Sequence, residues 1–229
     1  MSHLPEVSNS SLLAAYRNEV KVPLDRGQYV GFRQNLYQLG LYPTVAFPDR
    51  RISSVYYDTS DFSDYFDNIS GDANRSKTRI RWYNGDTSRL TLELKIKHNK
   101  ASRKEALRLE NPQGADPRTR EGLVDVLSGA ARASERLMLQ RLQPTLEVEY
   151  ERQYYTLDAD LRMTIDLGQK FRRLYPTPMA EMRSSPVFAV VEFKYPAAKS
   201  AVMKVLMRNL PERVFRHSKY VIGMECTAP

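Results

Sequence analysis

Cationic side chains alternate with uncharged ones in the run Ser76-Lys77-Thr78-Arg79-Ile80-Arg81-Trp82-Tyr83. Side chains two residues apart in a β-strand share a face, so Arg79 and Arg81 point one way while Ile80 and Trp82 point the other. The run Leu92-Glu93-Leu94-Lys95-Ile96-Lys97 repeats the alternation, with Glu93, Lys95 and Lys97 on one face. The turn Asn84-Gly85-Asp86 separates the two runs, which together predict a β-hairpin with one charged face.

Three later runs show the same arrangement. In the first run Tyr150, Arg152 and Tyr154 share a face. In the second run Arg162, Thr164 and Asp166 share a face, and in the third Glu192 and Lys194 do. A sheet with one solvated face is the common origin of such alternation. Its recurrence on five strands favours another interpretation, a partly desolvated channel whose cations and carboxylates must be neutralised. A phosphate chain with a divalent metal would satisfy both signs, because arginine forks bind phosphate and carboxylates bind Mg²⁺ or Mn²⁺.

The periodicity of the chain predicts an α+β fold. We expect helices at residues 26–39, 118–142 (broken near Ser128-Gly129), 196–209 and 218–224, a short helix or loop at 61–73, and no clear element at 168–182. We expect strands at 16–22, 51–57, 76–83, 89–97, 104–109, 145–157, 161–166 and 187–195. The short connections favour a closed antiparallel eight-stranded β-barrel with flanking helices. It would form one domain at residues 13–229, after a flexible N-terminus at 1–12.

The charge balance predicts an anionic partner. The 229 residues include 35 Lys and Arg against 27 Asp and Glu, a formal net charge of +8. Such a surface suits nucleic acid, membrane headgroups or a phosphate-rich small molecule. The basic residues are spread over strand-like segments and form no dense tail, which argues against a nucleic-acid-binding arm.

Several common site types find no support in the sequence. Cys226 is the only cysteine, so an internal disulfide cannot form. Glycine-rich phosphate loops, a Cys/His metal cluster and a serine triad have no matching motif. We see no secretory signal and no apolar stretch of the roughly 20 residues that a membrane helix needs. We therefore expect a cytoplasmic protein, with any attachment to a membrane made through a separate membrane-protein partner.

The chain resembles the VTC domain, the polyphosphate-polymerase branch of the triphosphate tunnel fold. The resemblance covers about residues 14 to 225. The matching segments are Arg17-Asn18-Glu19-Val20-Lys21, Val55-Tyr56-Tyr57-Asp58-Thr59, Arg79-Ile80-Arg81-Trp82-Tyr83, Leu92-Glu93-Leu94-Lys95, Tyr150-Glu151-Arg152, Arg162-Met163-Thr164-Ile165-Asp166, Val191-Glu192-Phe193-Lys194-Tyr195 and His217-Ser218-Lys219-Tyr220.

This resemblance implies a tunnel in which the γ-phosphoryl group of ATP is transferred to a growing polyphosphate, helped by Mn²⁺ or Mg²⁺. The catalytic residues that it implies are Lys219, near the transferred group, and Arg79, Arg81 and Lys95, which would neutralise the phosphates. Those expected to bind the rest of the substrate are Lys21, Lys97, Tyr150, Arg152, Arg162, Lys194 and Ser218. Glu192 matches the metal-binding glutamate. Lys219 could equally be an ordinary surface lysine of the last helix.

Three departures from the family pattern qualify this expectation. Related triphosphatases carry Glu-x-Glu-x-Lys in the first strand, and Arg17 stands at the first glutamate here, which favours the polymerase branch. Lys97 stands where eukaryotic members have a histidine. The chain shows no inositol-phosphate-sensing (SPX) domain and no membrane segment, so regulation and product translocation would involve other chains.

Other functions remain open at this point. The same tunnel could hydrolyse tripolyphosphate or nucleoside triphosphates with metal, or bind polyphosphate without turnover. A nucleic-acid-binding barrel is less favoured, because stacking aromatics flanked by basic residues are not clearly laid out. We also expect Arg79 to be an unpaired inward cation whose removal leaves the fold intact.

Overall fold

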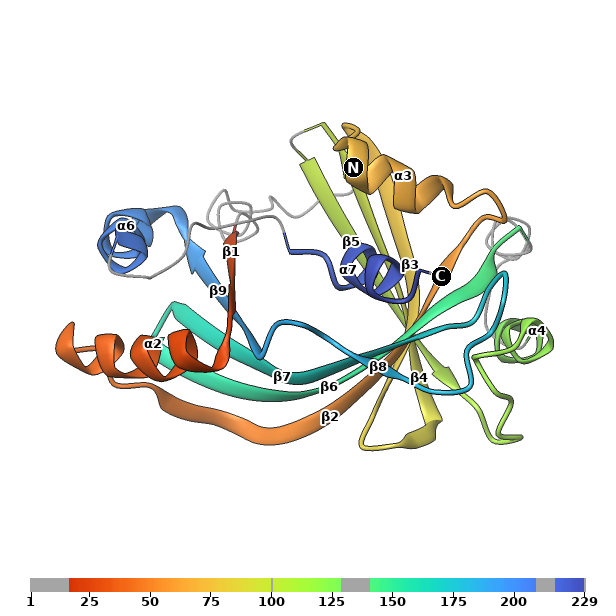
Figure 1. Ribbon diagram of the computed structural model, residues 1–229, viewed down its shortest axis with the longest axis horizontal. Helices are drawn as coiled ribbons and strands as arrows, with labels where there is room; N and C mark the ends of the chain where they lie inside the picture. The colour runs from red at the N-terminus through yellow and green to blue at the C-terminus, as the bar shows by residue number, and fades with distance from the viewer. Residues whose placement is uncertain (1–16, 100, 129–140, 209–216, 229) are drawn as a thin grey trace, which may run out of the picture. The chain divides into compact units, whose positions relative to one another are not determined.

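The computed structural model describes residues 17–99, 101–128, 141–208 and 217–228 (Figure 1). The predicted flexible N-terminus at 1–12 lies outside these residues. The chain divides into two compact units. Unit 1 consists of the described parts of Met1–Asp49, Arg152–Leu167 and Val187–His217, and unit 2 of those of Arg50–Glu151, Gly168–Pro186 and Ser218–Pro229.

Unit 1 is an antiparallel sheet with helices. Its strand order is β1-β9-β7-β6-β2. The strands are β1 (Arg17–Leu24), β9 (Ala189–Pro196) and the unit 1 portions of β7 (Leu161–Arg173), β6 (Gln143–Asp158) and β2 (Thr44–Asp58). The helices are α2 (Arg26–Gln38), a 3-10 turn η1 (Ala197–Lys199) and α6 (Ser200–Arg208).

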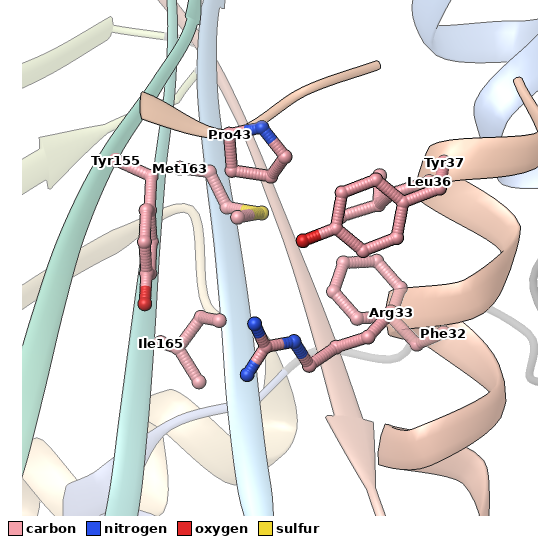
Figure 2. A pocket seen from close by; sticks show the side chains of 8 residues that line it. All are labelled: Phe32, Arg33, Leu36, Tyr37, Pro43, Tyr155, Met163 and Ile165. Atoms are coloured by element: carbon pink, nitrogen blue, oxygen red, sulfur yellow. The ribbon is translucent and has the colours of Figure 1, made fainter. Parts of the chain in front are cut away.

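A capping box starts α2. The Asp25 side chain accepts a hydrogen bond from the Gln28 backbone at 2.8 Å, and the Gln28 side chain accepts one from the Asp25 backbone at 2.8 Å. Phe32 and Leu36, four residues apart, then lie on one face of the helix and are buried in the unit 1 core. Figure 2 shows both side chains facing Met163 and Ile165 of β7. Burial of this helix face covers one side of the unit 1 sheet.

Unit 2 has the strand order β7-β6-β2-β3-β4-β5, with β8 (Arg183–Ser184) pairing β7. The new strands are β3 (Asn74–Tyr83), β4 (Asp86–His98) and β5 (Ala101–Glu110). The helices are α3 (Ser63–Ser70), α4 (Arg120–Ser128) and α7 (Lys219–Cys226). Asn84 and Gly85, with φ of 53° and 79°, make the tight turn between β3 and β4, as the sequence predicted.

Two apolar clusters cover the two faces of the unit 2 sheet. Ile80 and Trp82 of β3 belong to the cluster that contains Leu123 and Val126 of α4. The other cluster joins β2, β6 and β7 to α7, through Ile52, Tyr56, Leu146, Val148, Tyr150, Phe171, Tyr220 and Met224. Gly223 is needed in α7, because a Cβ there would lie 2.5 Å from Leu146 and 2.6 Å from Phe171.

The sheet-rich α+β class is confirmed, but not the closed barrel. The described residues form ladders along one strand order, and none of those ladders joins β1 to β5. The single-domain prediction stays a prediction.

Several predicted bounds differ from the structure. β2 begins at Thr44, seven residues before the prediction, and β7 continues to Arg173 into a stretch left without an element. Gly168, with φ of 60°, lies inside β7 and disguises the strand in the sequence. Of the helix predicted at 118–142, Arg120–Ser128 is helical and residues 129–140 lie outside the described part. The helices that the structure describes are all too short or too polar to cross a membrane.

Candidate functional site

The register of β3, β4 and β5 gathers cations on one face of unit 2. Lys77 lies opposite Lys95, and Lys95 lies opposite Lys104. The next pair along the same face is Arg79 opposite Glu93. Like charges directly opposite one another destabilise a sheet, so this row of lysines favours a bound anion.

Glu93 is the buried carboxylate at the centre of these cations. Its side chain accepts hydrogen bonds from Arg79 Nε at 2.7 Å and Lys104 Nζ at 2.9 Å, and Arg81 Nη1 lies 3.6 Å away. Burial raises the pKa of Glu93, but Arg79 and Arg81 outweigh burial and lower it to about 2. The expectation that Arg79 is unpaired is therefore wrong. Within the described residues these ion pairs join one carboxylate to three cations, which leaves an excess of positive charge.

The two arginines are also held by hydroxyl groups. Arg79 Nη1 donates to Tyr56 Oη at 2.8 Å. Arg81, only 7% exposed, lies 3.3 Å from both Ser54 Oγ and Tyr150 Oη. Such fixed guanidinium groups are preorganised, so little side-chain entropy would be lost when an anion binds.

Tyr56 responds to the same charges. Burial raises the pKa of its phenol, but nearby cations, above all Arg79 and Arg81, lower it to about 8. Lys219 contributes in the same direction. A phenol that ionises near pH 8 would add a negative charge to the cationic face.

The N-terminus of α7 meets this face. Ser218 caps the helix by accepting from Val221 N at 3.4 Å, and Lys77 Nζ donates to the Ser218 hydroxyl at 2.9 Å. Lys219 Nζ lies 4.7 Å from the ring centroid of Tyr150, in cation–π contact. The helix holds the half-buried Lys219 beside the buried Tyr150, and its role stays a prediction.

Tyr220 locks α7 in place. Its ring stacks on Tyr56 with centroids 5.3 Å apart, and its hydroxyl donates to Asp58 Oδ2 at 2.6 Å. Asp58 also accepts from the backbone amides of Asp64 and Tyr65 in the first turn of α3. The motif residues of β2 and α7 thus form one connected structure within unit 2.

Unit 1 carries a second charged cluster on one face of β1, β9 and β7. Glu192 accepts from Lys194 Nζ at 2.8 Å, and Lys21 Nζ and Arg152 Nη2 lie 3.9 and 4.0 Å from it. Arg152 also binds the fully buried Asp166, with Nη2 to Oδ2 at 2.8 Å. Burial raises the pKa of Glu192, but the cations, Lys21 first, lower it far below its usual range. Glu192 therefore stays ionised and can act as a metal ligand.

The donor set around Glu192 suits a metal only in the company of phosphate. Among the described residues, no three or more His, Cys, Asp or Glu side chains are grouped to hold a metal. Mg²⁺ is often held by one or two carboxylates together with substrate phosphates. Glu192 fits that mode, and phosphate oxygens and water would have to supply the remaining ligands.

Neighbouring positions on the unit 1 face are polar as well. Arg162 is exposed and lies opposite Lys194, and Thr164 lies opposite Glu192. The Thr164 hydroxyl oxygen is buried and has no hydrogen-bond partner among the described residues. Glu19 accepts from Lys21 at 2.5 Å. A ligand on this face would find the exposed guanidinium of Arg162.

The structure thus distributes the predicted residues over two clusters. Unit 2 contains Arg79, Arg81, Lys95, Lys97, Tyr150, Ser218 and Lys219, and unit 1 contains Lys21, Arg152, Arg162, Lys194 and Glu192. Lys97 is half-buried and lies opposite Arg75. The roles assigned to these residues, and the tunnel itself, stay predictions.

Glu93, Lys104, Lys77 and Tyr56 were missed as site residues. Alternation placed Glu93 on the charged face, and Tyr56 lay within a matching segment. Lys77 could have been found in the same way, because it lies two residues before Arg79 in the same strand. Lys104 could not be found in this way, because its place beside Glu93 depends on the register of β5.

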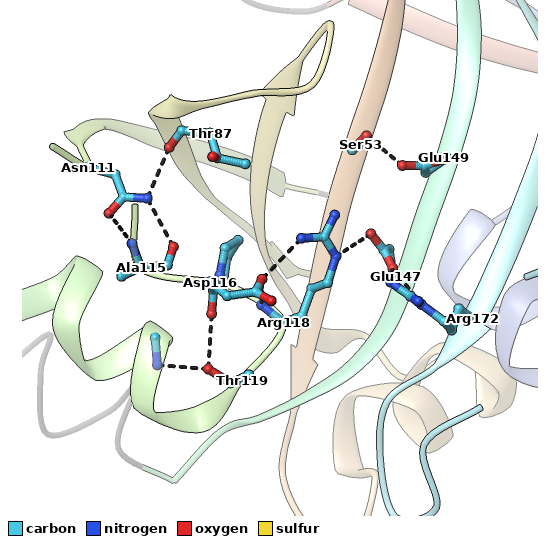
Figure 3. Close-up of polar contacts among 12 residues, drawn as sticks. Ser53, Thr87, Asn111, Ala115, Asp116, Arg118, Thr119, Glu147, Glu149 and Arg172 are labelled. Atoms are coloured by element: carbon cyan, nitrogen blue, oxygen red, sulfur yellow. Dashed lines mark hydrogen bonds and ion pairs between the residues drawn. The ribbon is translucent and has the colours of Figure 1, made fainter. Parts of the chain in front are cut away.

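Another buried carboxylate in unit 2 lies on the face of β6 opposite Tyr150. Glu147 is 1% exposed and accepts from Arg118 Nε at 2.6 Å and Arg172 Nε at 2.8 Å (Figure 3). Arg118 also binds Asp116 and lies 5.0 Å from the Trp82 ring. This network is balanced in charge and serves the packing of the sheet.

Comparisons with known proteins agree with the motifs. The family model described as VTC domain matches residues 17–228. The PH1819 protein from Pyrococcus horikoshii OT3 is 14% identical with a TM-score of 0.52, over 92% of this chain and 99% of that chain. A Bacillus halodurans protein proposed to be an adenylate cyclase is 15% identical with a TM-score of 0.52, over 88% and 93% of the two chains. At these identities the two structures share the fold alone. Among curated proteins, none matches significantly.

Proposed function

The chain belongs to the VTC domain family, and on that premise we propose that it is an ATP-dependent polyphosphate polymerase. It would transfer the γ-phosphoryl group of ATP to the end of a polyphosphate chain. The bond from the γ-phosphorus to the β-γ bridging oxygen breaks, a bond to a terminal acceptor oxygen forms, and ADP leaves. The observation that carries the proposal is the excess of fixed cations around Glu93.

Phosphoryl transfer demands positioning and charge stabilisation more than covalent help from the protein. Arg79 and Arg81 are held at fixed positions by Glu93, Tyr56 and Tyr150, and would bind phosphate oxygens as forked donors. Lys95 and Lys104 would add point charges along the same face. The acceptor phosphate is already ionised, so no side-chain base is required.

In unit 1, Lys21, Lys194, Arg152 and Arg162 would bind phosphate groups by charge. Glu192 would hold Mn²⁺ or Mg²⁺. When bound, such an ion neutralises charge that develops on phosphate oxygens. Arg17 at the first position of the triphosphatase signature favours transfer over hydrolysis.

A gel assay tests the proposal. The protein is incubated with ATP and Mn²⁺, and the products are separated by length. We expect long polymer from the wild type and none from Lys219→Ala. Free phosphate without polymer would instead identify a triphosphatase, and ATP or polyphosphate binding without turnover in any metal would identify a binding module.

The cellular setting stays a proposal as well. A cytoplasmic enzyme acting with a separate membrane-protein partner would match the expectations from the sequence. Co-purification of the full chain with membranes, lost when other proteins are stripped from them, would support such a partner. Binding to bare anionic vesicles would contradict it.

A further inference from the structure

One face of β6 in unit 1 carries a tyrosine that the phosphate chemistry does not use. Tyr155 and Leu157 pack against the unit 1 core. Figure 2 shows Tyr155 on the side of the strand that faces α2, across from Arg33 and Tyr37. Because side chains alternate along a strand, Tyr154 points to the other face, as does Arg152. Tyr154 therefore shares its face with the charged cluster of unit 1.

A second aromatic ring lies against Tyr154. The rings of Phe47 and Tyr154 meet edge to face, with centroids 5.9 Å apart and planes at 83°. Phe47 is nevertheless 58% exposed, and Val45, two residues earlier in β2, is 66% exposed. Val45, Phe47 and Tyr154 are here called the apolar shelf, in which more than half of the Phe47 and Val45 side chains is exposed to solvent.

The position of the shelf is more informative than its exposure. Single exposed apolar residues are ordinary on protein surfaces. Here, however, two rings in contact stand two residues, roughly 7 Å, along β6 from Arg152. Arg152 in turn lies beside Glu192, among the cations of the unit 1 cluster. An aromatic surface followed by cations on the same face matches the chemistry of a nucleotide, which has a flat base at one end and phosphates at the other.

We propose that the Val45–Phe47–Tyr154 shelf stacks the nucleobase of a nucleoside triphosphate whose phosphates lie on the unit 1 cations. This inference rests on the proposed function, because it assigns the donor's base to one side of the phosphate-binding face. Stacking reads the π-face of a base and no hydrogen-bond pattern. The site therefore accepts any base, and the larger purines bind more tightly than the pyrimidines.

Calorimetry with two probes separates base from phosphate. Wild type and Phe47→Ala are titrated with ATP and with inorganic tripolyphosphate. No divalent metal is added, so that neither probe is turned over during the titration. We expect Phe47→Ala to weaken ATP binding about 5- to 150-fold, the range of one base–aromatic stack. Tripolyphosphate has no base, so its affinity should change less than about twofold.

Phe66 provides a matched control. It is also 58% exposed and also meets a tyrosine ring edge to face, Tyr65 at 5.3 Å, but it lies on α3 in unit 2. Phe66→Ala should leave both affinities unchanged, and Phe47→Tyr should retain ATP binding because it keeps a ring.

Each other outcome overturns a different claim. Equal weakening of ATP and tripolyphosphate by Phe47→Ala, or no change in ATP binding, contradicts the shelf while the phosphate-binding function stands. Failure of the wild type to bind either probe overturns the proposed function and the shelf together.

Discussion

Unit 2 contains two buried carboxylates bound by arginine, and they differ in charge balance. Glu147 and Asp116 together meet two cations, Arg118 and Arg172, so that network is neutral. Glu93 alone meets three cations, so its network keeps an excess of two positive charges within the described residues. Lys104 is exposed, whereas Arg79 and Arg81 are largely buried and outnumber Glu93 by one charge. A largely buried charge that is not neutralised is costly, and a protein tolerates it where a ligand supplies the missing charge.

The difference also separates the two faces of the sheet. Glu147 binds Arg118, which packs on Trp82 in the apolar cluster with α4. Glu93 lies on the face that carries Arg79, Lys95 and Lys104. Burial and arginine pairing are common to both carboxylates, so they do not distinguish a site; we expect the excess of positive charge around Glu93 to do so.

The largest expected effect is the loss of polymer synthesis when an arginine that binds substrate is removed. Arg79→Ala should lower polymer synthesis about 100-fold or more, the usual effect of removing one preorganised donor. Arg172→Ala should leave synthesis per folded molecule unchanged. Both variants should lose a similar stability, about 1–2 kcal/mol, because each removes a charged hydrogen bond to a buried carboxylate. Rates and urea unfolding measured together check this, and equal losses of activity would erase the distinction between the clusters.

A second pair of variants replaces the buried carboxylates, Glu147 and Glu93, in place of the arginines that bind them. Glu147→Gln leaves Arg118 and Arg172 without their shared anion and should destabilise the protein by about 2–3 kcal/mol, with tripolyphosphate affinity unchanged. Glu93→Gln removes a negative charge from the cationic face and should raise tripolyphosphate affinity about fivefold. Urea unfolding and calorimetry give the two quantities. Tighter binding in Glu147→Gln, or weaker binding in Glu93→Gln, would contradict the charge-balance argument.

The sequence predicted which side chains share a face, because strand alternation is a local property. Alternation alone placed Arg79 with Arg81, and Glu192 with Lys194. The family was also predicted from motifs, and the match over residues 17–228 confirms it.

The sequence did not predict which residues lie opposite one another on neighbouring strands. Which residue lies across from Lys95 depends on the register of β5, and β5 shows little apolar alternation, since Leu107 is exposed and Leu109 is buried. The extent of β7 was hidden by Gly168, whose positive φ interrupts the period of two. Barrel closure is a property of distant strands, and local patterns do not determine it.

Tyr56 and Tyr57, which are adjacent in β2 and point to opposite faces of the sheet, should differ in how they respond to pH. The pKa of Tyr56 is lowered to about 8 by the cations, whereas burial raises the pKa of Tyr57, whose hydroxyl donates to Pro117 O, well above its usual value. Between pH 8 and 10 folded Tyr56 has lost its proton while the unfolded chain keeps it, so stability should rise with pH by about 2 kcal/mol. Over the same range the new phenolate should weaken tripolyphosphate binding.

Phenylalanine substitutions isolate the two hydroxyls. Tyr56→Phe should abolish both changes between pH 8 and 10, and Tyr57→Phe should retain them, because only Tyr56 faces the cations. Urea unfolding and calorimetry at several pH values provide the measurements. Identical pH profiles for wild type and Tyr56→Phe would show that Tyr56 does not titrate in this range.

The last comparison concerns unit 1, whose charged cluster can be set beside that of Glu147. Among the described residues, the ion pairs of this cluster join three carboxylates to three cations: Glu192, Asp166 and Glu19 to Lys21, Lys194 and Arg152. These charges balance, as they do around Glu147, and the exposed Arg162 lies opposite Lys194. An added cation would strengthen phosphate binding by a neutral cluster, which is the reason to expect a metal at Glu192. Glu192→Gln should therefore raise the Mn²⁺ concentration for half-maximal activity about tenfold. Asp158→Asn removes an exposed carboxylate paired with Lys199 and should leave it unchanged. If both variants need the same metal concentration as the wild type, Glu192 does not hold the metal. It would then only neutralise neighbouring cations within the protein, as Glu147 does.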